Sequence, residues 1–182
     1  MRVIGTVGLA GSGKGVIASV ADELGIPVIT MGDVIREECR ARGLDPAEHH
    51  GDVARALRKE EGPTAIAKRT LPRIDNALES NDVVVIDGIR SDVEVDVFEE
   101  HFGETFELIR IDAPFELRAS RLQERSRDET DGAAGLQARD AREREFGLDA
   151  AMAQADYSID NTSTLAAFEQ KARDLLNNDL PD

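Results

Sequence analysis

The residues with the clearest chemical potential lie near the start of the chain, in the segment GLAGSGKGV at residues 8–16. Its glycines allow a tight turn that points backbone N–H groups at an anion, and Lys14 adds a point charge. An apolar stretch precedes the segment and a helical one follows, which is the context of a phosphate-binding loop. The residues expected around the nucleotide phosphates are Gly8, Ala10, Gly11, Ser12, Gly13, Lys14, Gly15 and Val16.

The end of this loop departs from the usual pattern. That pattern, GxxxxGK[ST], closes with a hydroxyl that holds Mg²⁺. Here Lys14 is followed by Gly15 and Val16, and neither side chain can ligate a metal. GTPase-like switches and motor ATPases bind Mg²⁺ directly through that hydroxyl. The departure therefore argues against a hydrolytic switch.

Two further segments place an acid and an arginine after an apolar run. In VVVIDGIRS, Asp87 can orient Mg²⁺-bound water, Gly88 permits close backbone approach, and Arg90 follows. In ITMGDVIRE, Asp33 and Arg36 lie in the first turns of a helix. An arginine so placed can fork onto phosphate oxygens with two hydrogen bonds. The alternatives are a turn acid at a strand end and a solvated helix arginine.

A third group consists of arginines in two charged segments, LRASRLQERSRDETD and LQARDAREREFG. Charge on a transferring phosphoryl group is spread over its equatorial oxygens, so catalysis depends on positioning and electrostatic stabilisation. Acids are interleaved with these arginines, and a solvated, salt-bridged pair of helices is the alternative interpretation. The arginines are Arg118, Arg121, Arg125, Arg127, Arg139, Arg142 and Arg144.

The elements that must position these residues alternate along the chain. Strands are expected at residues 2–9, 26–30, 82–88, 106–113 and 156–160. Helices are expected at residues 13–25, 31–43, 46–80 with an interruption at Gly62-Pro63, 114–125 and 163–176, and a polar loop at 125–135. Such alternation implies a parallel sheet covered by helices on both faces. Ligands in these sheets bind beyond the carboxyl ends of the strands, where the motifs above all sit.

The composition limits the classes of function. With 37 acidic and 22 basic residues, the net charge of −15 argues against duplex nucleic acid as a partner. An aromatic content of 4% offers few stacking platforms for single strands. The acidic excess, with lysine at only four positions, resembles proteins of salt-loving archaea. No stretch has the apolar length of a membrane span or the form of a signal peptide, so we expect a cytoplasmic protein without a membrane partner.

The remaining reactive side chains have simpler interpretations. Cys39 is the single cysteine, which excludes a disulfide framework or a thiolate metal cluster. His49 and His50 are adjacent and cannot share a helix face, and we expect them to face solvent rather than to bind a metal.

The loop and both acid–arginine segments resemble the adenylate kinase group of nucleoside monophosphate kinases, whose loops read GxxGxGKG. The resemblance implies a three-layer α/β fold with a five-stranded parallel sheet. It places Arg36 and Arg90 on the acceptor phosphate, together with Asp33 and Gly88. In that group Mg²⁺ is held mainly by nucleotide phosphates and water, which leaves Asp87 to anchor the metal through water. The group usually has a threonine where this chain has Val16.

The arginine segments resemble the lid of the same kinases, in which arginines close over the transferring phosphate. By register Arg121 corresponds to an arginine that stacks on adenine, Arg125 to a phosphate contact and Arg127 to the first arginine of the returning segment. Arg139 corresponds to the second, although Arg142 competes with it. The chain end resembles dephospho-CoA kinases, whose last loop contacts the ATP base. Its matching residues here are Asn161 and Thr162, although a turn and a helix cap explain both equally well.

Taken together, the resemblance covers nearly the whole chain and is closest to archaeal adenylate-kinase-related, dephospho-CoA-kinase-like P-loop proteins. It implies one domain over residues 1–182, with a helical acceptor-binding insertion at 31–81 and a short lid at 121–144. The expected activity is transfer of the γ-phosphoryl group of ATP, with Mg²⁺, to AMP or another nucleoside monophosphate. Alternatives are a kinase acting on the 3′-hydroxyl of dephospho-CoA, with Asp33 or Asp87 as base, and an ATPase or nucleotide-binding regulator. A monomer and a homodimer are both open.

Overall fold

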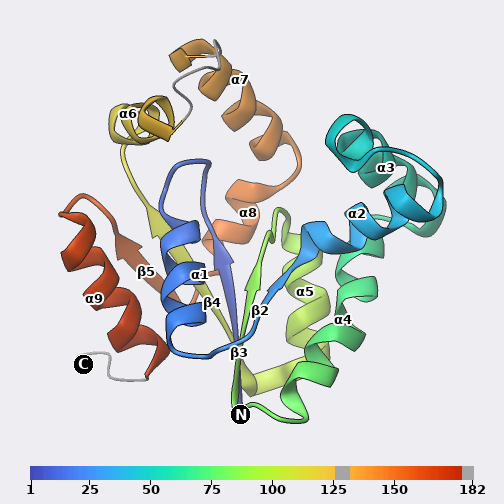
Figure 1. Cartoon of the computed structure of the whole chain (residues 1–182), viewed down its shortest axis with the longest axis horizontal. Coiled ribbons are helices and arrows are strands. Elements are labelled where there is room, and N and C mark those ends of the chain that lie inside the picture. The colour runs from blue at the N-terminus through green and yellow to red at the C-terminus, as the bar shows by residue number, and fades with distance from the viewer. Residues whose placement is uncertain (126–131, 178–182) are drawn as a thin grey trace.

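A computed structural model describes residues 1–125 and 132–177. Its sheet has five parallel strands in the order β2-β3-β1-β4-β5, covered on both faces by helices (Figure 1), which confirms the predicted fold class. The strands are β1 (Arg2–Val7), β2 (Val28–Thr30), β3 (Val83–Asp87), β4 (Phe106–Asp112) and β5 (Tyr157–Asp160).

The helices follow the strands and return the chain to the amino edge of the sheet. They are α1 (Lys14–Glu23), α2 (Met31–Ala41), α3 (Pro46–Glu61), α4 (Ala65–Leu78), α5 (Asp92–Phe102), a 3₁₀ turn η1 (Gly103–Thr105), α6 (Phe115–Arg125), α7 (Gly132–Glu145), α8 (Leu148–Ala153) and α9 (Leu165–Leu176). Among the described residues, no helix has the length and apolar character needed to cross a bilayer.

The central strands β1 and β3 bring the two main motifs together. Both are apolar and largely buried, as expected of strands covered on two faces. They pair in parallel, and Thr6 near the end of β1 is opposite Asp87 at the end of β3. The phosphate-binding loop after β1 and the acid–arginine segment after β3 therefore leave the sheet side by side.

Two hydrophobic clusters hold the layers. On one face α1 and α9 pack together over the sheet, with Phe168 fully buried in the cluster. On the other face α4, α5 and α8 cover the strands around Phe98. Burying such side chains contributes roughly 1.5–3 kcal/mol each. The core therefore lies beneath the carboxyl edge of the sheet and supports the loops there.

One predicted element needs correction here. Residues 132–135, expected in a polar loop, form the first turn of α7, and the alanines among them favour helix. Within the expected helical insertion at 31–81, α4 packs against both α2 and α3 and also contacts α5, β3 and β2. Of these three helices, α2 and α3 project farthest beyond the carboxyl edge (Figure 1). Residues 126–131, which include Arg127, lie outside the described part of the chain.

Candidate active site

The glycines of the loop after β1 stand where other residues would not fit. Gly8 has φ 154° and Gly13 has φ 123°. A Cβ on Gly8 would lie 2.5 Å from the carbonyl oxygen of Ile111, and one on Gly13 would lie 2.3 Å from Nδ2 of Asn161. Both approaches are closer than van der Waals contact permits. The backbone of this loop is therefore pressed between β4 and the segment after β5.

Gly15 differs from the other loop glycines. A Cβ added there would have no neighbour within 4 Å, and its φ lies outside the left-handed region. A serine or threonine would fit at this position. Steric crowding therefore does not explain why the metal-binding hydroxyl is missing.

Lys14 begins α1 and reaches back across its own loop. Its Nζ donates to the carbonyl oxygens of Gly8 at 2.5 Å and Leu9 at 3.2 Å. Burial lowers the pKa of Lys14 below its usual 10.5, while the carboxylates of Glu143 and Asp87 act in the opposite direction. A phosphate oxygen can replace those carbonyls as the acceptor and would favour the charged amine.

A cavity of about 170 Å³ joins the loop to the acid–arginine segment after β3. We call it the transfer cavity. It brings together Lys14, Asp87, Gly88, Arg90 and Arg139, which the sequence analysis had selected from three separate segments. Its full lining is Gly8, Lys14, Asp87, Gly88, Ile89, Arg90, Arg139, Glu143 and Leu148. Arg142, the competitor of Arg139, is exposed on the surface and does not line it.

Glu143 is a member of the transfer cavity that sequence analysis missed. Its Oε1 accepts hydrogen bonds from Nη1 of Arg90 at 3.2 Å and from Nε of Arg139 at 3.1 Å. The side chain is only 10% exposed. Sequence offers no signal for it beyond its place four residues after Arg139, because acids alternate with arginines throughout this segment. The carboxylate bridges an arginine from each side of the cavity.

The acids present suit a metal held through water and phosphate. No group of three or more His, Cys, Asp or Glu side chains in the described residues is arranged to hold a metal ion. Asp87 lines the transfer cavity and accepts a long hydrogen bond of 3.5 Å from the hydroxyl of Thr6. Mg²⁺ commonly keeps several waters and takes one or two carboxylates plus substrate phosphates. Asp87 fits that arrangement.

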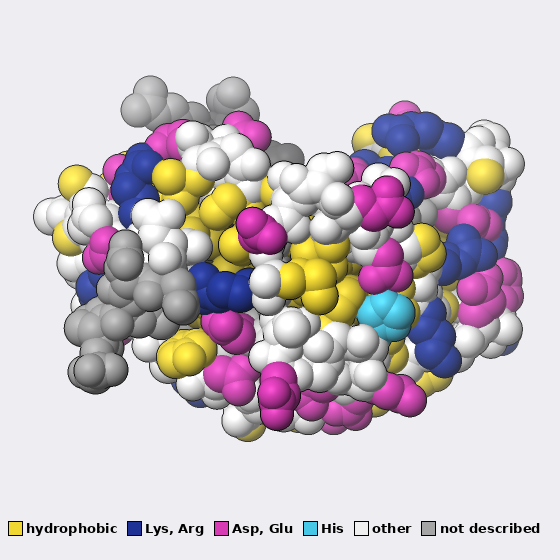
Figure 2. Space-filling model, turned by 90° about the horizontal axis from the view of Figure 1, so that it is seen from below, with side chains coloured by type: hydrophobic (Ala, Val, Ile, Leu, Met, Phe, Trp, Pro, Cys, Tyr) yellow, Lys and Arg dark blue, Asp and Glu magenta, His cyan; other side chains and the backbone are white. Residues whose placement is uncertain are grey.

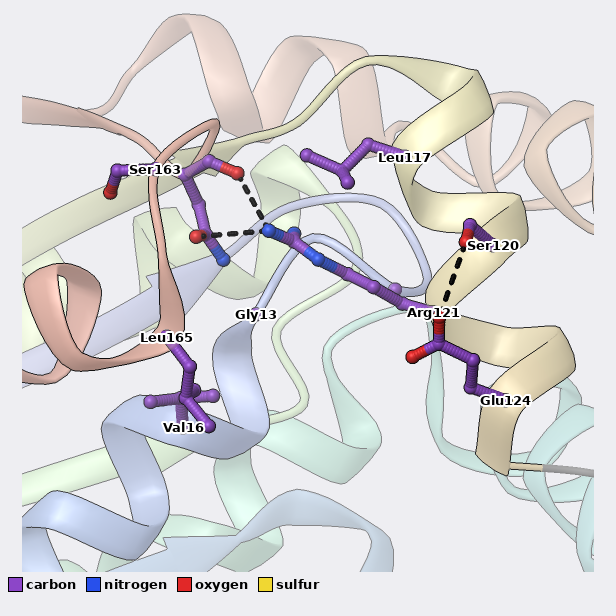
Figure 3. A pocket seen from close by; sticks show the side chains of 10 residues that line it. Gly13, Val16, Leu117, Ser120, Arg121, Glu124, Ser163 and Leu165 are labelled. Atoms are coloured by element: carbon purple, nitrogen blue, oxygen red, sulfur yellow. Dashed lines mark hydrogen bonds between the residues drawn. The ribbon is translucent and has the colours of Figure 1, made fainter.

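A second cavity of about 430 Å³ lies on the other side of the loop, and Figure 3 shows it from close by. We call it the outer cavity. Nη2 of Arg121 points toward Asn161, donating to its carbonyl oxygen at 2.9 Å and to its Oδ1 at 3.2 Å. Nδ2 of Asn161 donates to the carbonyl of Ser12 at 2.8 Å. The lining is Gly11, Gly13, Val16, Leu117, Ser120, Arg121, Glu124, Asn161, Ser163 and Leu165.

Two residues in this region occupy places different from those expected. The hydroxyl of Thr162 donates to Oδ2 of Asp160 at 2.8 Å in an exposed turn, and Ser163 lines the outer cavity instead. The N–H of Val16 donates to the carbonyl of Gly13 at 2.9 Å within the first turn of α1, while its side chain lines the outer cavity. Val16 thus lies between the loop and the outer cavity, and its phosphate contact stays a prediction.

Arg118 holds the phosphate-binding loop and the lid helices together. It is 3% exposed and makes a two-point contact with Asp140 of α7, at 2.6 and 3.0 Å. Nη1 also donates to the carbonyl of Ala10 at 3.0 Å. Within the loop itself, Oγ of Ser12 is buried and has no hydrogen-bond partner among the described residues. Buried hydroxyls are normally bonded, so this atom is suited to a ligand oxygen.

The acceptor-side residues lie at the start of α2. Asp33 accepts two hydrogen bonds from Arg36, at 2.7 and 2.9 Å, and both side chains are half-exposed. A Cβ on Gly32 would lie 3.3 Å from Nη1 of Arg36, and one on Gly88 would lie 3.4 Å from Cβ of Met31. The start of α2 therefore contacts the loop after β3 that carries Arg90. The side chain of Arg125 lies outside the described part of the structure.

The expectation that His50 faces solvent is wrong. Its Nε2 would lie 3.5 Å from a Cβ on Gly32, beside the guanidinium of Arg36. Burial lowers the pKa of His50 below 6.5, and the positive charges of Arg36, Arg90 and Arg58 act in the same direction. The imidazole is thus half-buried and neutral at pH 7, within the field of three arginines.

Comparison with known proteins agrees with this geometry. An AAA domain model matches residues 7–134. A UPF0200 protein of Halobacterium salinarum is 56% identical over all 182 residues of this chain, which is 95% of that protein.

Solved structures share the fold. A gluconokinase from Sinorhizobium meliloti superposes with a TM-score of 0.58 at 19% identity, covering 97% of this chain and 94% of that one. A shikimate kinase from Bacteroides thetaiotaomicron gives 0.59 at 17% identity, covering 97% and 98%. The arrangement of strands and helices is therefore that of P-loop kinases.

Proposed function

We infer a function from the premise that this chain belongs to the UPF0200 family of archaeal proteins and carries a nucleotide-binding, kinase-like P-loop domain. We propose that it is a phosphotransferase that moves the γ-phosphoryl group of ATP to a nucleotide-like acceptor. AMP or another nucleoside monophosphate is the first candidate acceptor.

One observation carries the proposal. Lys14 of the donor loop and Arg90 of the acceptor segment line the same cavity of about 170 Å³. Arg139 from α7 closes its third side. Phosphoryl transfer requires positive charge around the transferring group and on both oxygens between which it passes. An isolated nucleotide-binding module needs only the donor half of such a site.

The site residues divide between the two substrates. The backbone of the loop and Lys14 would hold the β- and γ-phosphates, with the base in the outer cavity beside Arg121 and Asn161. Arg36 and Arg90 would hold the acceptor phosphate. Bound Mg²⁺ would neutralise charge on the β- and γ-oxygens, and Asp87 would hold it through water. Arg125 and Arg127 remain predicted phosphate contacts of the lid.

The proposed reaction needs no general base. An oxygen of the acceptor phosphate attacks the γ-phosphorus, a new P–O bond forms, and the bond to the β,γ-bridging oxygen breaks. ADP leaves with the electron pair of that bond, and a nucleoside diphosphate is the second product. Arg139 would stabilise the equatorial oxygens during transfer. An arginine in this role is worth roughly 10³–10⁵ in rate.

A hydroxyl acceptor, such as the 3′-hydroxyl of dephospho-CoA, is the second candidate. The observation in its favour is that Asp87 lines the transfer cavity beside Lys14 and could accept a proton. Two structural neighbours are named shikimate kinase and gluconokinase, and both names refer to an acceptor that is a small hydroxy acid. This chain presents Arg36 and Arg90 on the acceptor side, which favours an acceptor that carries a phosphate.

An acceptor panel tests the proposal. The protein is incubated with Mg²⁺ and ATP, alone or with AMP, CMP, UMP, GMP or dephospho-CoA, and nucleotides are separated by anion-exchange chromatography. We expect ADP release to depend on a nucleoside monophosphate and to match diphosphate formation. ADP release that is the same without any acceptor would instead identify a hydrolase.

Arginine variants locate the acceptor site. Arg90→Ala should lower kcat/KM for the acceptor by about 10²–10³-fold, because a charge-assisted phosphate contact is lost. The dissociation constant of ATP should change much less. Arg142→Ala is the matched control, since Arg142 is an exposed arginine on the same helix as Arg139. Equal effects of the two substitutions would contradict the assignment.

A further inference from the structure

Three side chains next to the acceptor arginines have no role in the reaction as proposed. They are His50 and Arg58 of α3 and Phe146 at the end of α7. No motif selects them, and they come from segments nearly 90 residues apart in the sequence. The structure links all three to the acceptor arginines: His50 lies near Arg36, and Arg58, which contacts Phe146, is joined to Arg90 through Glu94.

Arg58 is fixed beside Arg90 by a buried acid. Nη2 of Arg58 donates to Oε1 of Glu94 at 3.1 Å, and Oε2 of the same carboxylate accepts from the backbone N–H of Arg90 at 2.9 Å. Glu94 is only 1% exposed. A buried carboxylate with both oxygens bonded holds its partners in one geometry. The Arg58 guanidinium is therefore tethered to the acceptor loop through Glu94.

Phe146 lies directly against that guanidinium. Cζ of Arg58 is 5.4 Å from the centre of the Phe146 ring, within the range of a cation–π contact. The ring is 49% exposed, whereas the other five phenylalanines, all in the described residues, are buried or partly buried. The exposed part of Phe146, next to the Arg58 guanidinium, is available to a ligand.

Phe146 lies in the sequence between two residues that line the transfer cavity. Glu143 and Leu148, on either side of Phe146 in the sequence, both line that cavity. The turn at Gly147, with φ 99°, packs against the acceptor loop, since a Cβ there would lie 2.9 Å from Oδ1 of Asp92. The end of α7 is therefore held against the segment that follows Arg90.

His50 completes the group on the phosphate side. It lies beside Arg36 over Gly32 and within the electrostatic reach of Arg58 and Arg90. Burial lowers the pKa of His50 most, and a bound phosphate would offset the arginine charges that lower it further. The group therefore offers Arg36 and Arg90 to a phosphate and the planar, apolar ring of Phe146 to a base. These are the two ends of a mononucleotide.

We propose that Phe146 and Arg58 form the platform on which the base of a nucleoside monophosphate acceptor stacks, with His50 contacting its phosphate. The inference rests on the proposed transferase function and narrows its acceptor to molecules with an aromatic base. Stacking of a base on an aromatic side chain tolerates different bases, because every base presents a π face. Modest discrimination among bases is therefore expected, together with strong discrimination against acceptors that lack one.

The test compares AMP with ribose 5-phosphate as acceptors. The wild-type protein should use AMP with kcat/KM at least about tenfold higher. Phe146→Ala should raise the KM for AMP about tenfold and leave that for ribose 5-phosphate unchanged, while Phe146→Trp should retain AMP use. Tyr157→Ala is the control, because Tyr157 is the other exposed aromatic residue and lies on the edge strand β5. Equal use of the two acceptors, or no effect of Phe146→Ala, would overturn the proposal.

A binding measurement separates this inference from the proposed function. With the donor site saturated by a non-hydrolysable ATP analogue, AMP is titrated calorimetrically into wild type, Phe146→Ala and His50→Ala. We expect weaker AMP binding in both variants, with the analogue bound as in wild type. If wild type transfers to no acceptor but binds AMP through Phe146, the transferase proposal fails and the platform stands. If AMP does not bind at all, the platform is overturned.

Discussion

At the scale of single residues, the site is defined by opposed charges in a small volume. Lys14, Arg90 and Arg139 share the transfer cavity with Asp87 and Glu143. Burial works against the charge of Lys14, and the two carboxylates partly restore it. The two carboxylates provide negative charge beside Lys14 when no nucleotide is bound. The phosphates of a bound nucleotide would add to that charge. The protonation of Lys14 should therefore be linked to nucleotide binding.

ATP binding should weaken as pH rises through the lowered pKa of Lys14, below the usual 10.5. The charged amine binds phosphate and the neutral amine does not, so binding in this range should also take up protons. The free energy of unfolding depends on pH in the opposite direction to the affinity for ATP. Because the native pKa lies below the unfolded value, stability gains from Lys14 deprotonation as pH rises. Calorimetric titration of a non-hydrolysable ATP analogue from pH 7 to 10, in buffers of different ionisation enthalpy, measures both affinity and proton uptake.

Two variants test the cause of this pH dependence. Lys14→Arg should remove it, since a guanidinium stays charged throughout this range. Glu143→Gln should move the loss of binding to lower pH, because Glu143 exerts the largest influence that raises the pKa of Lys14. Affinity that stays constant to pH 10 in the wild type would contradict the assignment.

At the scale of elements, one buried ion pair joins α6, α7 and the phosphate-binding loop. Arg118 and Asp140 are 3% and 8% exposed, and their contact is two-pronged. The same guanidinium binds the carbonyls of Ala10 and Ala113. The helices expected to form a mobile lid are thus anchored to the loop at their base.

Arg118→Ala should lower the free energy of unfolding by about 3–5 kcal/mol, because it leaves the buried carboxylate of Asp140 unpaired. Replacing both partners, as in Arg118→Met with Asp140→Leu, should recover much of that loss while ATP binding stays weakened, since the contact with Ala10 is still missing. Chemical denaturation followed by circular dichroism measures the first effect and calorimetry the second.

Arg144→Ala serves as the control for this pair. Arg144 is a half-exposed arginine on α7, the helix that carries Asp140, and it makes a looser contact of 3.5 Å with Asp149. Its removal should change the unfolding midpoint little. A loss for Arg118→Ala no larger than that for Arg144→Ala would show that the buried pair does not hold the loop.

At the scale of the whole molecule, charge is distributed unevenly. The chain has 37 acids and 22 bases, and its net charge is −15. On the face opposite the site, acidic side chains border an apolar area (Figure 2). At the carboxyl edge, Arg90 and Arg139 line the transfer cavity and Arg121 lines the outer cavity. Repulsion among the surface acids opposes folding at low ionic strength.

Added salt should therefore stabilise the protein. Raising KCl from 0.1 to 2 M shortens the Debye length from about 10 Å to below about 3 Å, which screens this repulsion. Each gain of about 1 kcal/mol should raise the melting temperature by about 2–4 °C for a chain of this size. Thermal melts followed by circular dichroism, with sucrose as an uncharged control, measure the effect. A melting temperature that falls with KCl would show that the surface ion pairs outweigh the repulsion.

The sequence by itself determined the parts of this protein that depend on local pattern. Spacing of glycines around Lys14, apolar runs ending at Asp87, and the alternation of strands with helices are all local properties, and they predicted the loop, the parallel sheet and the residues at its carboxyl edge. The meeting of Lys14 and Arg90 followed from the rule that parallel strands end at one edge.

Only the tertiary structure decided which charged residues point into the site. Arg118, Arg139 and Arg142 look alike in a segment where acids and arginines alternate, yet one is buried under the loop, one lines the transfer cavity and one faces solvent. Glu143 and Phe146 carry no motif at all. Their roles depend on how α7 packs against the loop after β3, and that packing is set by contacts about 50 residues apart, such as Arg90 with Glu143. Local sequence patterns encode backbone periodicity and cannot specify such partners.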